Sequence, residues 1–133
     1  MTSLTHIATP DGVAPGVNYS HVVWGTGRFV ALSGQCALDE KGAVVGEGAP
    51  VAQAHQVFEN LRRCLEAAGA TFDDVIKMTV FVTDIALLPA IREARDAHLT
   101  NGRLPATSAV QVAALFRPEL LMEIEAFAVV ADR

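Results

Sequence analysis

The feature that most constrains the fold of this 133-residue chain is one change in the spacing of its apolar residues. Before residue 50 and after residue 70 these residues fall mainly in short runs, whereas between them they recur at steps of three and four. That spacing places them on one face of a helix. Pro50 suits the first turn of such a helix, and Gly69 suits its left-handed C-terminal cap. The sequence therefore predicts a helix over residues 50–69, with strands on either side of it.

Strands are predicted before this helix at residues 21–24 and 28–33, which are apolar runs separated by turn residues. A third, short extended piece follows at residues 43–45. We expect these segments to pair in sequence as a meander of antiparallel strands that opens the chain.

After the helix, residues 75–83 form a β-branched run long enough for a central strand. A second helix is expected over residues 87–99, where Asn101-Gly102 ends the pattern, and further strands at residues 107–113 and 121–130. In the last strand, the odd-numbered side chains from Leu121 to Phe127 and the even-numbered ones from Met122 to Ala128 would face opposite sides of the sheet.

The predicted order, ββ(β)αβαββ, is that of an α+β protein, a two-layer sandwich of one sheet and two helices. The length fits a single domain over residues 1–133. Hydrophobic residues make up 51% of the chain and charged residues 19%, as in a compact globular protein. A sheet that is apolar on both faces needs a second cover, so we expect the protein to bury surface against copies of itself.

Charge and targeting signals restrict the partners of the chain. The net charge is −5 and no run of Lys and Arg stands out, which argues against nucleic acid as a partner. Residues 1–6 lack the pattern of a signal peptide, and no apolar run is long enough to cross a membrane. Cys36 and Cys64 fit neither a metal knuckle nor a disulfide framework. We expect a cytoplasmic protein with no membrane contact.

Familiar catalytic signatures are absent, so candidate chemistry is limited to a few positions. His55 and Glu59 have the spacing of a metal pair, but a solvated helix face explains them better because no further ligands are in view, and no metal or cofactor is expected. Glu123 and Glu125 lie in an apolar strand, where a carboxylate is costly unless it is paired, hydrogen-bonded or working in acid–base chemistry. Gly34 at a strand end is either an ordinary turn residue or a backbone donor to a ligand.

Five segments together resemble the RidA/YjgF family, in order from about Val17 to Val130. They are Asn18-Tyr19-Ser20, residues 29–35 (FVALSGQ), residues 59–70, residues 73–84, and the closing pair 105–108 (PATS) and 122–126 (MEIEA). The resemblance implies a homotrimer of chorismate-mutase-like protomers with sheets facing the centre and clefts between subunits. The best-known members hydrolyse reactive enamines and imines to carbonyl compounds and ammonia.

Carried over residue by residue, the resemblance implies a site with Tyr19, Gly34 and Glu123 as catalytic residues and Ser33 beside them. Thr107 stands where deaminating members carry the Arg that binds the substrate carboxylate. A guanidinium binds a carboxylate through two charge-assisted bonds, which one hydroxyl cannot replace. Arg92 and Arg103 are the candidates to supply that cation instead.

The function that follows is hydrolysis of a small C=N or enamine compound by an enamine/imine deaminase or a related hydrolase, without a cofactor. The alternative is a non-catalytic trimer that binds or senses a small molecule, which the loss of the anchoring Arg favours. An endoribonuclease has least support, because the chain has no basic stripe for a phosphate backbone.

Overall fold

The computed structural model describes residues 4–132, and within them three strands precede the first helix: β1 (Thr5–Ile7), β2 (Val22–Trp24) and β3 (Arg28–Gln35). Helix α1 (Pro50–Ala67), strand β4 (Val75–Val82), helix α2 (Leu88–His98) and strands β5 (Ala106–Gln111) and β6 (Met122–Val130) follow. Short 3-10 turns, Phe72–Asp74 and Ile85–Leu87, lead into β4 and α2. The predicted α+β order is confirmed. Residues 1–3, part of the segment assessed for a leader, lie outside the described residues.

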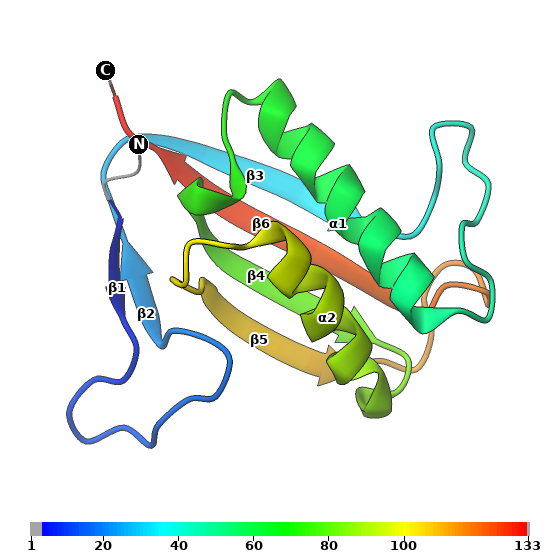
Figure 1. Cartoon of the computed structure of the whole chain (residues 1–133), viewed down its shortest axis with the longest axis horizontal. Helices are drawn as coiled ribbons and strands as arrows, with labels where there is room; N and C mark the ends of the chain where they lie inside the picture. The colour runs from blue at the N-terminus through cyan, green and yellow to red at the C-terminus, as the bar shows by residue number, and fades with distance from the viewer. Residues whose placement is uncertain (1–3, 133) are drawn as a thin grey trace.

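The main sheet has the strand order β3-β6-β4-β5, and β1 pairs with β2 in a separate two-stranded sheet (Figure 1). Strand β6 runs antiparallel to both of its neighbours, whereas β4 and β5 are parallel and are joined through α2. The last strand of the chain therefore lies at the centre of the sheet, and β3 and β5 form its two edges.

The predicted opening meander is wrong in two respects. Strand β3 pairs with β6 rather than β2, and residues 43–45 contribute only an isolated bridge between Leu38 and Val44. At Gly27, which has φ +147°, a side chain would collide with the backbone carbonyl of Val130. The turn after β2 therefore carries the chain across the end of β6 instead of folding β3 back onto β2.

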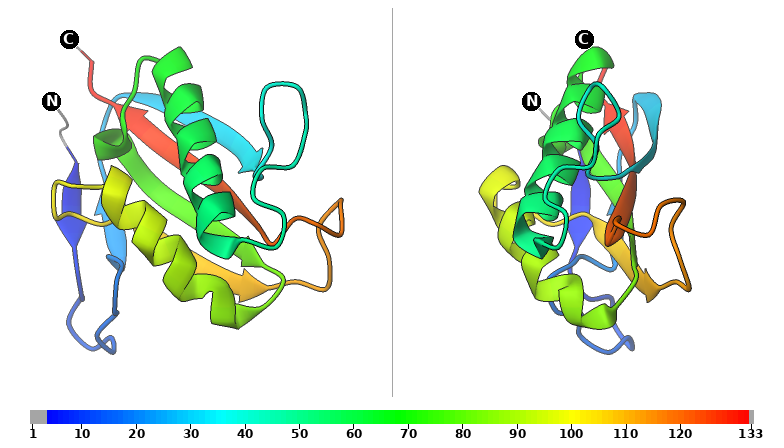
Figure 2. Two further views of the ribbon diagram at one scale, coloured as in Figure 1. Left: turned by 45° about the vertical axis from the view of Figure 1, so that its right-hand side comes forward. Right: turned by 90° about the vertical axis from the view of Figure 1, so that its right-hand side faces the viewer.

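Both helices cover one face of the main sheet (Figures 1 and 2). The core lies between these layers, and the side chains of α1 that reach it have the predicted three-and-four spacing: Gln53, Ala54, Val57, Phe58, Leu61 and Leu65. The helix begins at Pro50 and is followed by Gly69 at φ +71°, as predicted. In β6 the even-numbered side chains from Met122 to Ala128 are buried toward the helices. The alternation predicted for this strand is confirmed.

The other face of the sheet carries no helix (Figure 2) and mixes apolar and polar side chains. Phe29 is 62% exposed and its ring stacks on that of Phe127 at 5.5 Å between centroids. Lys77 Nζ donates to Ser108 Oγ at 2.7 Å on the same face. Cover of this open face by a second copy of the chain stays a prediction. Among residues 4–132, neither helix has the combination of length and apolarity needed to cross a membrane.

One polar side chain inside the core connects the loops at the ends of strands β3 and β6. Gln53 is fully buried; its Nε2 donates to the carbonyls of Gly46 and Glu119, and its Oε1 accepts from the Leu121 N–H at 3.0 Å. The loop after β3 and the loop before β6 are therefore both tied to the first turns of α1.

Replacing Gln53 by Met, which keeps the length of the side chain, is expected to lower the free energy of unfolding by about 3 kcal/mol, because three partly buried backbone groups lose their partner. Gln111→Met is the matched control, since that exposed side chain accepts a single bond from the Ile85 N–H and its loss should cost about 1 kcal/mol or less. Urea unfolding of both variants measures the difference; equal losses would contradict the role given to Gln53.

Candidate functional site

The predicted carboxylate Glu123 lies on the open face of β6, against a break in the neighbouring strand. The pairing of β3 with β6 shifts register between Leu32 and Gln35, so that Ser33 and Gly34 form a β-bulge. The Glu123 carboxylate lies so close to Gly34 that a side chain on this residue would overlap the Oε2 atom. A bulge withdraws backbone groups from the strand ladder, and such bulges are common beside active sites. Gly34, Ser33 and Glu123, singled out separately from the sequence, are thus brought together.

Cys36 completes this arrangement, and sequence reasoning gave it no role in the site. Its thiol is buried and donates to Glu123 Oε1 at 3.3 Å. Burial, followed by the hydrogen bond to Glu123 and the negative charge of that carboxylate, raises the pKa of Cys36 to about 12. The thiol therefore stays protonated, as a hydrogen-bond donor to the carboxylate and a poor nucleophile.

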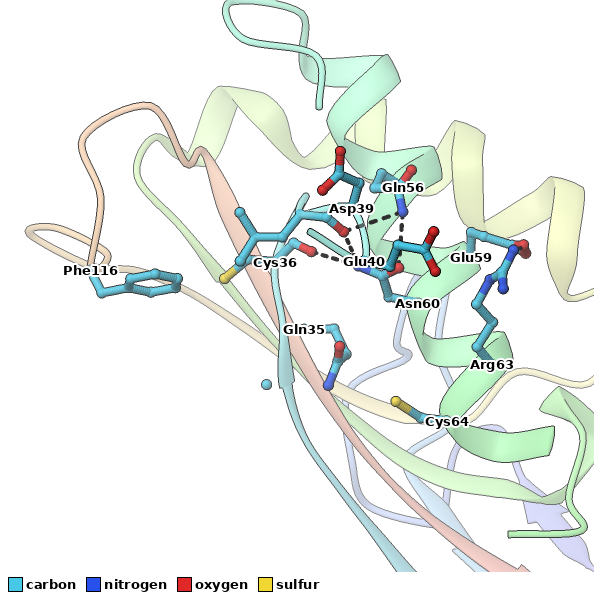
Figure 3. Close-up of a pocket in the computed structure, with 12 residues that line it drawn as sticks. Gln35, Cys36, Asp39, Glu40, Gln56, Glu59, Asn60, Arg63, Cys64 and Phe116 are labelled. Carbon is cyan, nitrogen blue, oxygen red and sulfur yellow. Dashed lines mark hydrogen bonds and ion pairs between the residues drawn. The ribbon is translucent and has the colours of Figure 1, made fainter. Parts of the chain in front are cut away.

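A groove of about 710 Å³ runs beside Gly34 and Cys36, between the end of β3 and helix α1 (Figure 3). On its helix side, the amide of Asn60 donates to the carbonyls of Cys36 and Leu38, which fixes the start of the loop after β3. Phe116, 64% exposed, lies at the other side of the groove. Glu123 does not line this groove; its carboxylate reaches the β3 edge on the open face of the sheet, beside Gly34.

A second cavity, of about 350 Å³, lies at the opposite edge, between α2 and strands β4 and β5. It brings together Tyr19, Thr107 and Arg92, three residues predicted from distant parts of the sequence. Arg103 lies in the turn before β5 and lines neither this cavity nor the groove beside Gly34.

The loop that carries Tyr19 is fixed by a buried arginine. Arg95 Nη1 donates to the carbonyl of Asn18 at 2.7 Å, and Asn18 itself adopts a left-handed conformation with φ 67°. The Tyr19 ring meets that of His21 edge-on. Sequence reasoning missed Arg95, although its position seven residues after Leu88 places it on the apolar stripe of the second helix, where a charge needs a specific partner.

The two arginines of α2 differ in whether an acidic side chain pairs with them. Arg95 is paired with Asp96 at 2.9 Å, whereas Arg92 makes no hydrogen bond or ion pair with any other residue that the structure describes. Thr107 Oγ1 donates its one proton to the Pro105 carbonyl at 3.1 Å. Arg92 is therefore the group with free donors for an anion in this cavity.

The two halves of the candidate site do not meet within one protomer. Glu123 pairs in register with Phe81 and lies on the open face, whereas Thr107 pairs with Met78 and lies toward the helices. With two strand spacings between β6 and β5, the halves are about 10 Å apart across the sheet and on opposite faces of it. A single small molecule cannot contact both halves of the same protomer.

Other polar side chains of α1 interact with neighbouring side chains of the two helices. Glu59 accepts from Arg62 at 2.6 Å, and these hydrogen bonds, ahead of the charges of Arg62 and Arg63, lower the pKa of the Glu59 carboxyl to about 2. His55 lies beside the ring of His98, with 6.1 Å between centroids. Over the part of the chain that the structure describes, no group of three or more His, Cys, Asp and Glu side chains could hold a metal ion.

Comparison with known proteins identifies the class to which this fold and these residues belong. The family model described as endoribonuclease L-PSP matches residues 9–130. The Rid-family protein YyfB of Yersinia pestis superposes with a TM-score of 0.87 at 35% identity, over 97% of this chain and 100% of that one. RidA from an Antarctic Psychrobacter species gives a TM-score of 0.71 at 37% identity, over 95% and 99%.

Sequence relatives agree with this class. The chain is 40% identical to the 2-iminobutanoate/2-iminopropanoate deaminase of Salmonella typhimurium over 105 residues. This match covers 77% of this chain and 80% of that protein. It is 38% identical to protein DfrA of Myxococcus xanthus over 121 residues, or 90% and 88% of the two chains. The chain belongs to the RidA/YjgF family, which includes imine deaminases.

The pairing of Cys36 with Glu123 predicts how the thiol titrates. In a Cys64→Ser background, alkylation of Cys36 by iodoacetamide should stay slow at pH 8 and accelerate only at much higher pH, because the raised pKa keeps the thiol protonated. Glu123→Gln removes the negative charge and should lower the pKa of Cys36, while burial still holds it above that of a free thiol. The pH profile of alkylation measures both effects. An unchanged profile in Glu123→Gln would contradict the pairing.

Proposed function

We propose that this protein hydrolyses the C=N bond of small imines, and of the enamines that tautomerise to them, at sites shared between neighbouring subunits of a homotrimer. Membership of the RidA/YjgF family and the deaminase names of several relatives support the reaction. In this chain, support comes from Glu123 beside Gly34 and Cys36, and from the residues that line the cavity at the β5 edge.

The observation that carries the proposal is the separation of two complementary half-sites. One half, at the β3 edge, supplies a carboxylate and the backbone of a β-bulge; the other, at the β5 edge, supplies a cation, a phenol and an apolar cavity. The cavity at the β5 edge has no carboxylate among its lining residues, and the arginine that lines the groove at the β3 edge, Arg63, is paired with Glu59. A closed ring, in which the β3 edge of one subunit meets the β5 edge of the next, would join them and also cover the open face of the sheet.

In the proposed reaction, the oxygen of a water molecule adds to the imine carbon, and the π electrons of the C=N bond move to nitrogen. Glu123 accepts a proton from this water and returns it to the nitrogen. The hydroxyl of the resulting carbinolamine then gives its proton, through Glu123, to the nitrogen, and the C–N bond breaks as the C=O bond forms, which releases ammonia and leaves a carbonyl compound. Cys36, which donates to Oε1, fixes the orientation of the carboxylate while Oε2 faces the bulge at Gly34.

Arg92 is the proposed anchor for a substrate carboxylate. Its guanidinium lines the cavity with no partner among residues 4–132, whereas the Thr107 hydroxyl already donates a hydrogen bond to the Pro105 carbonyl. A half-buried cation without a partner favours an anion at this position, since binding restores the missing counter-charge.

A non-catalytic trimer that binds the same class of anion is the second candidate. The observation that favours it is Thr107, whose hydroxyl is hydrogen-bonded to Pro105 and supplies no charge at the position of the expected Arg. Ribonuclease activity, which the description of the family model names, fits less well with a net charge of −5. RNA binding that weakens steeply with salt would favour that third function.

Freshly generated 2-iminopropanoate should release ammonia faster with the wild-type protein than spontaneously. Glu123→Gln should lower this activity by about 10²-fold or more, because the proton acceptor is lost while the shape of the side chain is kept. Glu125→Gln is the matched control, a carboxylate two residues along on the same face of β6. No acceleration by a folded wild-type protein would leave the non-catalytic trimer as the function.

Mixed trimers test whether the half-sites come from different subunits. Co-expression of Glu123→Gln with Arg92→Met should restore about a quarter of the wild-type sites, since some interfaces then combine an intact Glu123 with an intact Arg92. Each variant alone should remain weakly active. If both half-sites belonged to one protomer, the mixture would show no recovery, and light scattering would separately show whether the protein is a trimer.

A further inference from the structure

The cavity that holds Tyr19, Arg92 and Thr107 also has a large apolar lining. Its floor is formed by four apolar side chains that are otherwise almost completely buried: Phe58, Met78, Val80 and Ile91. They come from α1, β4 and α2, so the space reaches the core between sheet and helices. The cavity is therefore a pocket with an apolar interior rather than a shallow surface for anions.

The small residues on β5 leave this interior open. Thr107 and Ala109 form its wall on the strand side, and the Thr107 hydroxyl turns back to the Pro105 carbonyl, which leaves the pocket no proton donor at that position. Leu88 and Ile91 line the facing side, from α2. The interior offers apolar contacts and no free hydrogen-bond donor from the strand.

The two arginines that line this pocket are not equivalent. Arg95 is neutralised by Asp96 and holds the Asn18 carbonyl, so it positions the loop that carries Tyr19. Arg92 has no such partner among residues 4–132. The pocket therefore offers one free cation beside a cavity of about 350 Å³ with an apolar floor.

We propose that this pocket selects 2-imino acids with large apolar side chains, branched aliphatic or aromatic, binding the carboxylate at Arg92 and the side chain over Met78 and Val80. This inference rests on the proposed imine hydrolysis and names its substrate class. A methyl side chain would leave most of the cavity unfilled, and an unfilled apolar cavity forfeits the contacts of its lining. Such imines arise when an oxidase removes two electrons and two protons from a leucine-like or phenylalanine-like amino acid, passing them to its flavin.

The test compares imines made in the assay by an amino-acid oxidase from alanine, leucine and phenylalanine. Hydrolysis is measured in competition with semicarbazide, which traps the free imine. We expect kcat/KM for the leucine or the phenylalanine imine to exceed that for the alanine imine by about tenfold or more, since even one methylene in an apolar pocket changes this ratio about tenfold. Equal values, or a preference for the alanine imine, would overturn the inference and leave the proposed hydrolysis intact.

Binding of the reaction products separates failure of the inference from failure of the function. Calorimetry should show 4-methyl-2-oxopentanoate or phenylpyruvate binding at least about tenfold more tightly than pyruvate. If this order holds without any turnover, the pocket has the proposed selectivity and the hydrolytic function is wrong. If pyruvate binds as tightly as both of the larger acids, the selectivity is wrong whatever the activity.

Variants locate the selectivity in this pocket. Ala109→Leu narrows it from β5 and Leu88→Phe narrows it from α2, so that one variant remains informative if the other does not fold. In both, the affinity ratio of large to small oxo acids should fall toward one. Arg92→Met should weaken the binding of all three oxo acids. Arg103→Met, which removes a cation outside the pocket, should leave these affinities unchanged. Unchanged ratios in folded Ala109→Leu and Leu88→Phe would place the side-chain site elsewhere.

Discussion

The structure depends on the register of one strand, β6, which lies at the centre of the sheet and pairs with β3 and β4. Its alternating side chains build the core on one face and place Glu123 on the other. A slip of one residue would put the carboxylate among the apolar side chains of the core and expose the neighbouring Met122 and Ile124. The hydrophobic pattern that specifies the core therefore also specifies the position of the candidate catalytic carboxylate.

The geometry around this strand gives each edge of the sheet a different chemistry. At the β3 edge, the bulge at Ser33-Gly34 leaves room for the Glu123 carboxylate, and the buried Cys36 thiol donates to it. At the β5 edge, the parallel connection through α2 brings Arg92 beside Thr107. Edge strands and exposed apolar side chains such as Phe29 on the open face are liabilities for an isolated domain. Closing a ring would remove both and would join the half-sites in the same step, which is the physical basis of the proposed trimer.

Within α2, two arginines of the same turn have different surroundings, and this difference shapes the second cavity. Arg95 is buried, is paired with Asp96 and holds the loop that carries Tyr19. Arg92, three residues earlier, lines the cavity without a described partner. A paired cation fixes structure, whereas an unpaired one is available to a ligand. The rigid loop and the free charge together account for a pocket in which an anion and an apolar group can be held in one orientation.

The sequence by itself determined the class of fold, the long helix, the alternation of the last strand and the family, because all of these depend on local spacing or on contiguous motifs. It also singled out Glu123, Gly34, Tyr19 and Thr107. Only the tertiary structure decided that β3 pairs with β6, that Arg92 rather than Arg103 lines the cavity, and that Cys36 donates to Glu123. Each of these joins residues far apart in the chain. Local propensity carries no information about such pairs. The free energy of each contact depends on how the sheet and the helices pack in the folded protein, and this is not encoded in neighbouring residues of the chain.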